Sequence, residues 1–374
     1  MAAKKSRVEA AAVPAEELAG EFPELDLPVR PPFPPMEAKP AARLPGGPGG
    51  EGWLYEPKWD GFRCLAFRKG AAIALQSKSG QPLDRYFPEM VAAFAALPVK
   101  TFVLDGEIVI ESGGGLDFDA LLQRIHPAAS RIRKLAAETP ASFHAFDLLV
   151  DARGGSLVEM PLAERRERLE ALFAKLPAGE RIMLSPATPD HAVAARWMRE
   201  LGGAGLDGVI AKLAESPYLS GERGGMVKVK RVRTADCVVG GFRWAQVGSR
   251  NEGQIGSLLL GLYNGAGRLD HVGFSSSFTA EEREELVPVL LPLREPPGFT
   301  GKAPGGPSRW SQGRSTEWEP LRPALVCEVR FDHFSGGRFR HGTRFLRWRP
   351  EKRPEQCTFE QVRPRAVPLS KLGL

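Results

Sequence analysis

The chain has 374 residues, of which 43% are hydrophobic and 26% are charged, so it is long enough for two domains and too apolar for general disorder. No stretch approaches the roughly 20 consecutive apolar residues of a membrane span, and the N-terminal residues lack the apolar region of a secretory signal. The four cysteines are scattered without a CxxC pair, which argues against a disulfide framework or a zinc site. We expect a soluble protein of a reducing cytoplasm, without a membrane.

The first elements in chain order are irregular. Residues 1–25 are rich in Ala and Glu, and we expect a flexible N-terminal extension. Residues 28–50 are dense in Pro and Gly, which predicts an extended approach to the fold rather than a packed element.

Short runs rich in Val, Ile, Phe and Leu begin at residue 52 and are typical of strands. Two amphipathic helices are predicted among them, one at 162–176 after Pro161 and one at 190–203 that stops at Gly202 or Gly203. This mixture predicts an α+β domain with largely antiparallel sheets over residues 26–231.

A second domain is predicted after a basic connector at residues 231–235. Gly-rich turns there separate five or so short strands, and residues 280–293 carry one helical pattern. This combination is typical of a small β-barrel of the OB type, so we assign residues 235–374 to it. The connector would act as a hinge between the domains.

The net charge is +6, and most of the excess lies between residues 328 and 353, where eight basic residues stand against three acidic ones. Phenylalanines and a tryptophan are interleaved with the arginines. Clustered arginines with aromatic residues suit a polyanion such as nucleic acid or nucleotide phosphate. A strand pair with Arg outward and Phe inward explains the same pattern, and this segment alone slightly favours that simpler explanation.

The stretch YEPKWDGFR at residues 55–63 brings an amine, a carboxylate and a guanidinium close together. Lys58 lies between Pro57 and Gly61, which predicts a tight loop between two strands. A lysine can carry a phosphoryl group as a reactive phosphoramidate if positive neighbours, desolvation or a metal lower its pKa from about 10.4. Taken alone, the stretch is more often a solvated strand edge.

Four further motifs follow it in order, each offering a charged or flat side chain. They are LDGE with Glu107, FDLL with Phe146, DGVIAK with Asp207 and Lys212, and VKVKR with Lys228 and Lys230. Carboxylates with several lysines describe a site for magnesium and a triphosphate. Each motif alone is more often a surface feature, but five in this order are hard to dismiss.

Together with SKSG at 77–80 and RWRPEK at 347–352, the set resembles the nucleotidyltransferase superfamily of ATP-dependent polynucleotide ligases and capping enzymes. The two-domain length is similar to that of the compact C-type bacterial ATP-dependent DNA ligases. The resemblance implies an ATP-grasp-like α+β nucleotidyltransferase domain followed by an OB-fold domain. It implies an enzyme that uses ATP with Mg²⁺ or Mn²⁺ to seal nicked double-stranded DNA in repair and recombination.

The resemblance also implies a role for each matching residue. Lys58 would carry the AMP, and Asp60 would assist the later steps. Glu107 and Asp207 would hold the metal. The remaining nucleotide-binding residues would be Glu56 at the adenine edge, Arg63 at the ribose, Phe146 stacked on the base, Lys78, and the phosphate-binding Lys212, Lys228, Lys230, Arg349 and Lys352. Glu107 would contact the nucleotide as well.

The sequence departs from the family pattern at four positions. Lys78 stands where Arg is preferred, Asp207 where Glu is commoner, and Glu351 where Asp is usual, while Met226 replaces a frequent Trp. The first three keep their charge, so they affect fine geometry rather than chemistry.

Three alternatives stay open at this point. A GTP-dependent capping-type enzyme uses the same lysine chemistry, and an RNA ligase differs mainly in strand preference. A non-catalytic nucleic-acid-binding protein would bind DNA in a salt-sensitive way without forming covalent AMP. We expect a monomer associated with the bacterial nucleoid. Recruitment by a DNA-end-binding repair protein is an open question.

Overall fold

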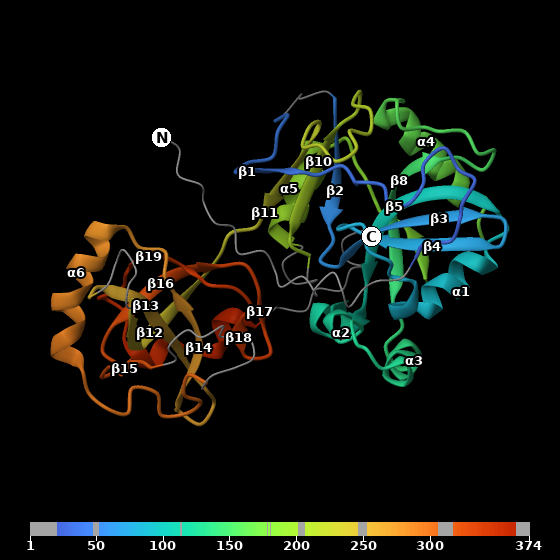
Figure 1. The fold of residues 1–374 in the computed structure, drawn as a ribbon. Coiled ribbons are helices and arrows are strands. Elements are labelled where there is room, and N and C mark those ends of the chain that lie inside the picture. The colour runs from blue at the N-terminus through green and yellow to red at the C-terminus, as the bar shows by residue number, and fades with distance from the viewer. Residues whose placement is uncertain are drawn as a thin grey trace. The chain divides into compact units, whose positions relative to one another are not determined.

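The computed structural model describes residues 21–363 apart from 48–51, 113, 178, 180, 201–205, 246–252 and 306–316. The chain divides into two compact units at the bond between Arg231 and Val232 (Figure 1). The first unit comprises the described residues up to 231, and the second unit the described residues from 232.

The first unit contains a four-stranded sheet in the order β1-β11-β10-β2. The strands are β1 (Lys39–Ala41), β2 (Trp53–Lys58), β10 (Gly208–Leu213) and β11 (Met226–Lys230). β1 pairs with β11 in parallel, and the other pairs are antiparallel. Strands distant in the sequence therefore become neighbours in this sheet.

Side chains alternate between the two faces of this sheet, as in any strand. The apolar set Tyr55, Val209 and Ala211 is buried on one face. Helix α5 (His191–Glu200) packs against that face through Ala194 and Trp197. The opposite face is left for the charged residues of the motifs.

The second sheet of the first unit has the order β4-β3-β5-β8-β9. Its strands are β3 (Phe62–Lys69), β4 (Ala72–Ser77), β5 (Thr101–Val109), β8 (Ser142–Val150) and β9 (Ile182–Leu184). All pairs are antiparallel except β8 with β9. The predicted α+β architecture with largely antiparallel sheets is confirmed.

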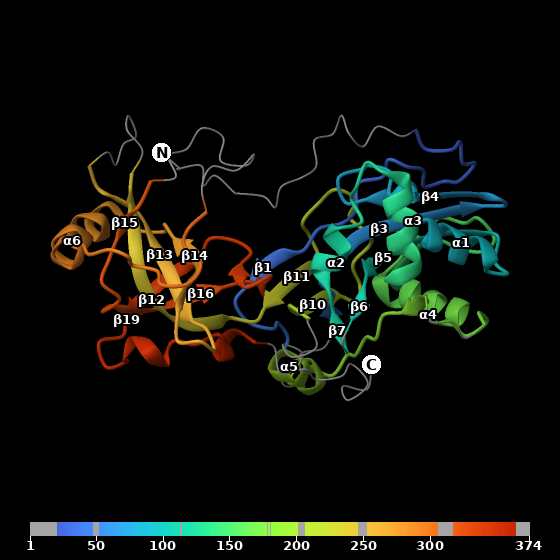
Figure 2. The ribbon, with the colours of Figure 1, turned by 90° about the horizontal axis from the view of Figure 1, so that it is seen from below.

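Helices cover one face of the second sheet (Figure 2). They are α1 (Pro88–Ala96), α2 (Phe118–Leu122), α3 (Ala129–Glu138) and α4 (Leu162–Phe173). The short turn η2 (Asp84–Tyr86) precedes α1, and the hairpin of β6 (Glu111–Ser112) and β7 (Gly115–Leu116) lies between α1 and α2 in the chain. Helix α4 begins after Pro161, as predicted, and buries Leu169 and Leu172. The predicted end of α5 at Gly202 or Gly203 lies outside the described residues.

Residues 25–36, here called the N-terminal segment, cover the other face of the second sheet. This corrects the expectation that residues 28–50 only lead into the fold without packing against it. Leu25, Leu27, Val29 and Met36 are all buried in one cluster with Leu65 and Phe67 of β3, among others. This face of the sheet is apolar, so it must be covered by another layer. A Pro-rich chain can supply that layer without forming a strand ladder, because prolines lack the N–H donor.

The second unit is a β-structure with the strand order β14-β13-β12-β16-β19. Its main elements are β12 (Arg233–Trp244), β13 (Ile255–Tyr263), β14 (Leu269–Ser275), β16 (Val326–Phe331), β19 (Arg344–Trp348) and the helix α6 (Ala280–Leu290). Shorter elements are η4 (Leu291–Leu293), β15 (Glu319–Pro320), β17 (Phe334–Ser335), β18 (Arg338–Phe339), η5 (Pro354–Gln356) and η6 (Phe359–Val362). Five main strands and one helix agree with the predicted OB-type fold.

The two edge strands of this unit approach each other at one end. Ser275 and Thr343 form an isolated bridge, and the Ser275 hydroxyl donates to the Thr343 carbonyl at 3.0 Å. No continuous ladder closes the barrel among the strands that the structure describes. Because β12 already begins at Arg233, the expected connector 231–235 is reduced to the two residues before that strand.

All four cysteines are buried free thiols. Over the described ranges, no helix is both long and apolar enough to cross a membrane.

The packing of the N-terminal segment can be tested with Leu27, which is 2% exposed. We expect Leu27→Ala to lower the free energy of unfolding by about 2–4 kcal/mol, as for other buried Leu→Ala changes. Leu122→Ala, at a position 46% exposed, should change it by less than about 0.5 kcal/mol. Urea unfolding of both variants makes the comparison, and equal stabilities would contradict a packed segment.

Candidate active site

The motif residues of the first sheet lie on the face opposite α5, because they occupy alternate positions in three paired strands. Lys58 on β2 is in register with Gly208 on β10, which is in register with Lys230 on β11. One row further along, Glu56 is opposite Ile210, and Ile210 is opposite Lys228. Strand pairing thus gathers residues from YEPKWD, DGVIAK and VKVK on one surface.

Two lysines of this surface share one carboxylate oxygen. Asp207 Oδ2 lies 2.9 Å from Lys58 Nζ and 3.2 Å from Lys230 Nζ. The Asp207 side chain is only 4% exposed. The following Gly208 has φ of +153°, and a Cβ there would clash with the Val229 carbonyl, so the glycine lets the strands approach beside the shared carboxylate.

The charge state of Lys58 differs from the sequence-based expectation of a lowered pKa. Burial alone would lower the pKa of its ammonium group, but the carboxylates around it, chiefly Asp207, outweigh burial and raise that pKa. The other contributing carboxylates are Asp60 and Glu107. In the protein alone, Lys58 is therefore a protonated cation that must lose its proton before it can attack an electrophile.

Glu107, on β5 of the second sheet, is paired in register with Arg63 of β3. Burial raises the pKa of its carboxyl to about 7, although the charges of Arg63 and Lys58 oppose the shift. Gly61 makes the approach of the motif to β5 close, because a Cβ at residue 61 would meet Glu107 Cγ at 2.8 Å. The glycine of KWDGFR thus brings the two motifs together.

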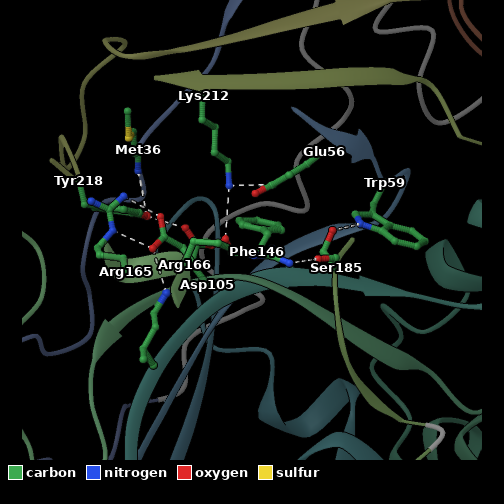
Figure 3. Close-up of polar contacts among 12 residues, drawn as sticks. Met36, Glu56, Trp59, Asp105, Phe146, Arg165, Arg166, Ser185, Lys212 and Tyr218 are labelled. Carbon is green, nitrogen blue, oxygen red and sulfur yellow. Dashed lines mark hydrogen bonds and ion pairs between the residues drawn. The ribbon is translucent and has the colours of Figure 1, made fainter. Parts of the chain in front are cut away.

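Glu56 and Lys212 form a buried ion pair beside Phe146 (Figure 3). Lys212 Nζ lies 2.8 Å from Glu56 Oε2 and 4.5 Å from the centre of the Phe146 ring. Glu56 Oε1 is buried, and within the described part of the chain it has no hydrogen-bond donor. Since an unsatisfied buried acceptor is costly, this oxygen is suited to a donor group of a ligand.

Arg63 lies on the other sheet but contacts the same Phe146 ring, with its guanidinium carbon 4.6 Å from the ring centre. It forms a two-point ion pair with Asp105, in which Nε and Nη2 each lie 2.5 Å from a carboxylate oxygen. Arg63, Phe146 and Lys212 line one pocket together with Met36, Tyr218 and other residues. Three of the predicted nucleotide-binding residues therefore meet at a single pocket, which Lys58 does not line.

Other predicted residues do not join this group. Lys78 is exposed after β4 and pairs with Glu37, directly after the N-terminal segment, at 3.2 Å. Arg349 and Lys352 belong to the second unit, where they lie 2.8 Å and 2.6 Å from the two oxygens of Asp236. Their predicted contacts with a nucleotide remain predictions, as does the orientation role of Asp60.

Sequence reasoning missed several residues that position the site. Asp105 lies in the LDGE motif itself, two positions before Glu107, and was passed over for that glutamate. Asp147 of FDLL holds Arg165 of α4 through two contacts of 2.8 and 2.9 Å. Tyr218 and Asp236 stand in stretches with no charge pattern that would single them out.

Trp59, the neighbour of Lys58, is also fixed. Its indole N–H donates to the Ser185 hydroxyl at 2.9 Å (Figure 3). Its ring stacks on His144 with 3.8 Å between ring centres. Burial lowers the pKa of His144 to about 3, so this imidazole stays neutral. Through these two contacts, Trp59 attaches the end of β2, where Lys58 lies, to the second sheet.

The residues fit a magnesium ion held jointly with a nucleotide. Among the described residues, no group of three or more His, Cys, Asp or Glu side chains forms a ready-made metal site. Mg²⁺ is usually bound by one or two carboxylates plus substrate phosphates rather than by a protein cage. Glu107 and Asp207, both close enough to act on the charge of Lys58, match that mode of binding.

The raised pKa of Glu107 predicts a pH-dependent stability. Between its ordinary pKa of 4.5 and about 7, the folded protein holds a proton that the unfolded chain has released, so ionising Glu107 destabilises the fold as pH rises. We expect Glu107→Gln to raise the free energy of unfolding at pH 8 by about 1 kcal/mol or more and to change it little at pH 5. Urea unfolding at both pH values tests this.

The control for this test is Glu138→Gln on α3, at a side chain that is 56% exposed, where the change in the free energy of unfolding should stay within about 0.5 kcal/mol. If Glu107→Gln is destabilising at pH 8, the attraction of Glu107 to its cations outweighs burial and the assignment is wrong.

Comparisons with known proteins identify the family of the chain. Two family models match, "ATP dependent DNA ligase domain" over residues 35–230 and "ATP dependent DNA ligase C terminal region" over residues 251–352. DNA ligase C1 of Mycolicibacterium smegmatis is 47% identical over 349 residues, covering 90% of this chain and 96% of that protein. DNA ligase C of Mycobacterium tuberculosis is 45% identical over 363 residues, covering 93% and 99%.

A solved structure of a Lig E DNA ligase aligns with a TM-score of 0.50 at 17% identity, over 84% of this chain and 100% of that one. At that identity the likeness concerns the fold alone. The two family models and the identities of 45–47% over nearly the whole length of the relatives show that the chain belongs to the ATP-dependent DNA ligases.

Proposed function

We propose that Lys58 is the nucleophile with which this DNA ligase takes AMP from ATP before sealing a nick. The proposal rests above all on one observation. Lys58 shares the Asp207 carboxylate with Lys230, on the sheet face that also carries the buried Glu56–Lys212 pair. A nucleophile, phosphate-binding cations and an acceptor for the base therefore stand on one surface.

The reaction has three displacements at phosphorus. The Lys58 amine forms a bond to the α-phosphorus of ATP as the bond to the β-phosphate breaks and pyrophosphate leaves. A 5′-phosphate oxygen at the nick then takes the AMP from the lysine. Finally the 3′-hydroxyl attacks that 5′-phosphate, loses its proton and displaces AMP. In each step, cations around the phosphates offset the charge on the transferring group.

The protein must free the Lys58 amine of its proton for the first step. Glu107 and Asp207 would hold a Mg²⁺, which would supply charge neutralisation to the phosphates. Asp207 is the first among the carboxylates that raise the pKa of Lys58. Any ligand that offsets the charge of Asp207 would leave burial, which lowers the pKa of Lys58, to favour the neutral amine.

The buried Glu56 carboxyl beside Phe146 would favour adenine over guanine. Glu56 Oε1 is a buried acceptor that no described group satisfies, and the adenine edge offers an amino donor there. Guanine places a carbonyl oxygen at the equivalent position, which would face the carboxylate. This favours the ATP-dependent ligase over the capping-type alternative. Arg63 and Phe146 would hold the ribose and the base, while Lys212, Lys228 and Lys230 would contact phosphates.

A repair role is proposed from more distant relatives. A multifunctional non-homologous end joining DNA repair protein, LigD of Mycobacterium tuberculosis, is 33% identical over 316 residues, covering 82% of this chain and 37% of that protein. We propose that this chain, too, acts on DNA breaks as a monomer near the nucleoid, with a DNA-end-binding protein as its recruiting partner.

The nucleophile is tested by incubating the protein with Mg²⁺ and α-labelled ATP or GTP, followed by denaturing electrophoresis. We expect label from ATP that is lost in Lys58→Ala, because that variant lacks the amine. Lys39→Ala, at an exposed position of the same sheet, should label like the wild type. Label from GTP alone would move the chain to capping chemistry, and absence of label from a DNA-binding protein would leave only a binding module.

The role of the second unit is tested by measuring lysine adenylation and the sealing of a pre-adenylated nick separately. We expect Arg349→Ala and Lys352→Ala to slow lysine adenylation about tenfold or more, because each removes a cation proposed for the departing pyrophosphate, and to spare the sealing of a pre-adenylated nick. Arg294→Ala, which breaks an exposed ion pair with Glu319 in the same unit, is the control. A parallel loss in both reactions would refute the step-specific role.

A further inference from the structure

The hydroxyl of Tyr218 closes a ring of hydrogen bonds on the wall of the nucleotide pocket (Figure 3). Tyr218 donates to Asp105 Oδ2 at 2.6 Å and accepts from the Met36 N–H at 3.1 Å. Asp105 in turn accepts two bonds from Arg63, and Arg63 Nη2 also reaches the Met36 carbonyl at 3.5 Å. Four residues from distant parts of the chain thus hold one another.

We propose that Tyr218 is a positioning residue that orients Arg63 for the nucleotide. Asp105 Oδ2 serves both the phenol and the guanidinium, so the phenol fixes the plane of the carboxylate that Arg63 follows. Asp105 is fully buried and Tyr218 is 3% exposed, so water does not substitute for either partner. The inference rests on the proposed role of Arg63 at the nucleotide.

The geometry leaves Arg63 one free edge. Its Nε and Nη2 are occupied by Asp105 and Met36, whereas Nη1 has no protein acceptor among the described residues. A guanidinium held by a fork of two bonds presents its remaining donors in a fixed direction. The guanidinium also lies against the Phe146 ring, so its free donors stand beside the surface proposed to stack on the base.

The ring also extends the pocket to the N-terminal segment. Met36 contributes both its backbone N–H and its carbonyl, and the same segment is seated by Leu25, Leu27 and Val29 in the apolar cluster that includes Tyr218. The segment therefore forms part of the pocket wall and holds Arg63 through its main chain, beyond any role as a cover for the sheet.

Tyr218→Phe tests the proposal, since it removes only the hydroxyl. We expect the KM for ATP in lysine adenylation to rise roughly tenfold, as for the loss of a hydrogen bond to a charged group. The sealing of a pre-adenylated nick should stay within twofold. Tyr86→Phe is the matched control, because Tyr86 is also 3% exposed but lies on η2, in the apolar cluster beneath the helices of the second sheet.

A second variant, Asp105→Asn, keeps the shape but loses the charge that holds Arg63, and should raise the KM further. An unchanged KM in Tyr218→Phe, or equal losses in both reactions with a lowered melting temperature, would overturn the positioning role. Failure of the proposed function would instead appear as absence of label on wild-type Lys58. In that case, the affinity for ATP is measured by calorimetry on the wild type and on Tyr218→Phe. A weaker affinity in the variant supports the positioning role, and an equal affinity overturns it.

Discussion

The alternation of side chains along β2, β10 and β11 is the constraint on which the site depends. Tyr55, Val209 and Ala211 must face α5 to be buried, and this sends Glu56, Lys58 and their partners to the opposite face. A shift of one residue in the pairing would exchange the two sets. The apolar contact with α5 therefore determines the face on which the lysines lie.

A second principle is that cations of the site are held by carboxylates. Asp207 holds Lys58, Glu56 holds Lys212, and Asp105 holds Arg63, each at 2.9 Å or less. Buried charges require such partners, because an unpaired charge is strongly destabilising. The pair with Asp207 also keeps Lys58 protonated, because that carboxylate raises the pKa of the lysine against the effect of burial.

Much of this could be predicted from the sequence, because motif chemistry and strand alternation are local properties. The two-unit architecture and the antiparallel sheets follow from patterns readable in single segments, whereas the meeting of Arg63, Phe146 and Lys212 was implied by the resemblance of the ordered motifs to a family. The burial of residues 25–36 could not be predicted in this way. A Pro-rich composition indicates that a segment lacks regular structure, but it does not indicate that one face of the second sheet is apolar and needs a cover.

The same limit applies to charge. A lowered pKa for Lys58 was predicted from what a nucleophile needs, but the actual direction depends on three carboxylates whose distances only the fold sets. Asp105 and Tyr218 were missed for a related reason. Their importance lies in a hydrogen-bond ring between segments far apart in the chain, and Tyr218 stands in a stretch without a recognisable motif.

The pairing of β2 with β10 has a consequence for how the protein is made. Lys58 and its register partner Gly208 are about 150 residues apart, whereas β3, β4, β5 and β8 are complete by Val150. During synthesis from the N-terminus, the second sheet can pair its long strands while β2 still lacks its neighbour. The surface that carries Lys58 is therefore assembled late, when β10 and β11 leave the ribosome, and a truncated chain would contain the lysine without its site.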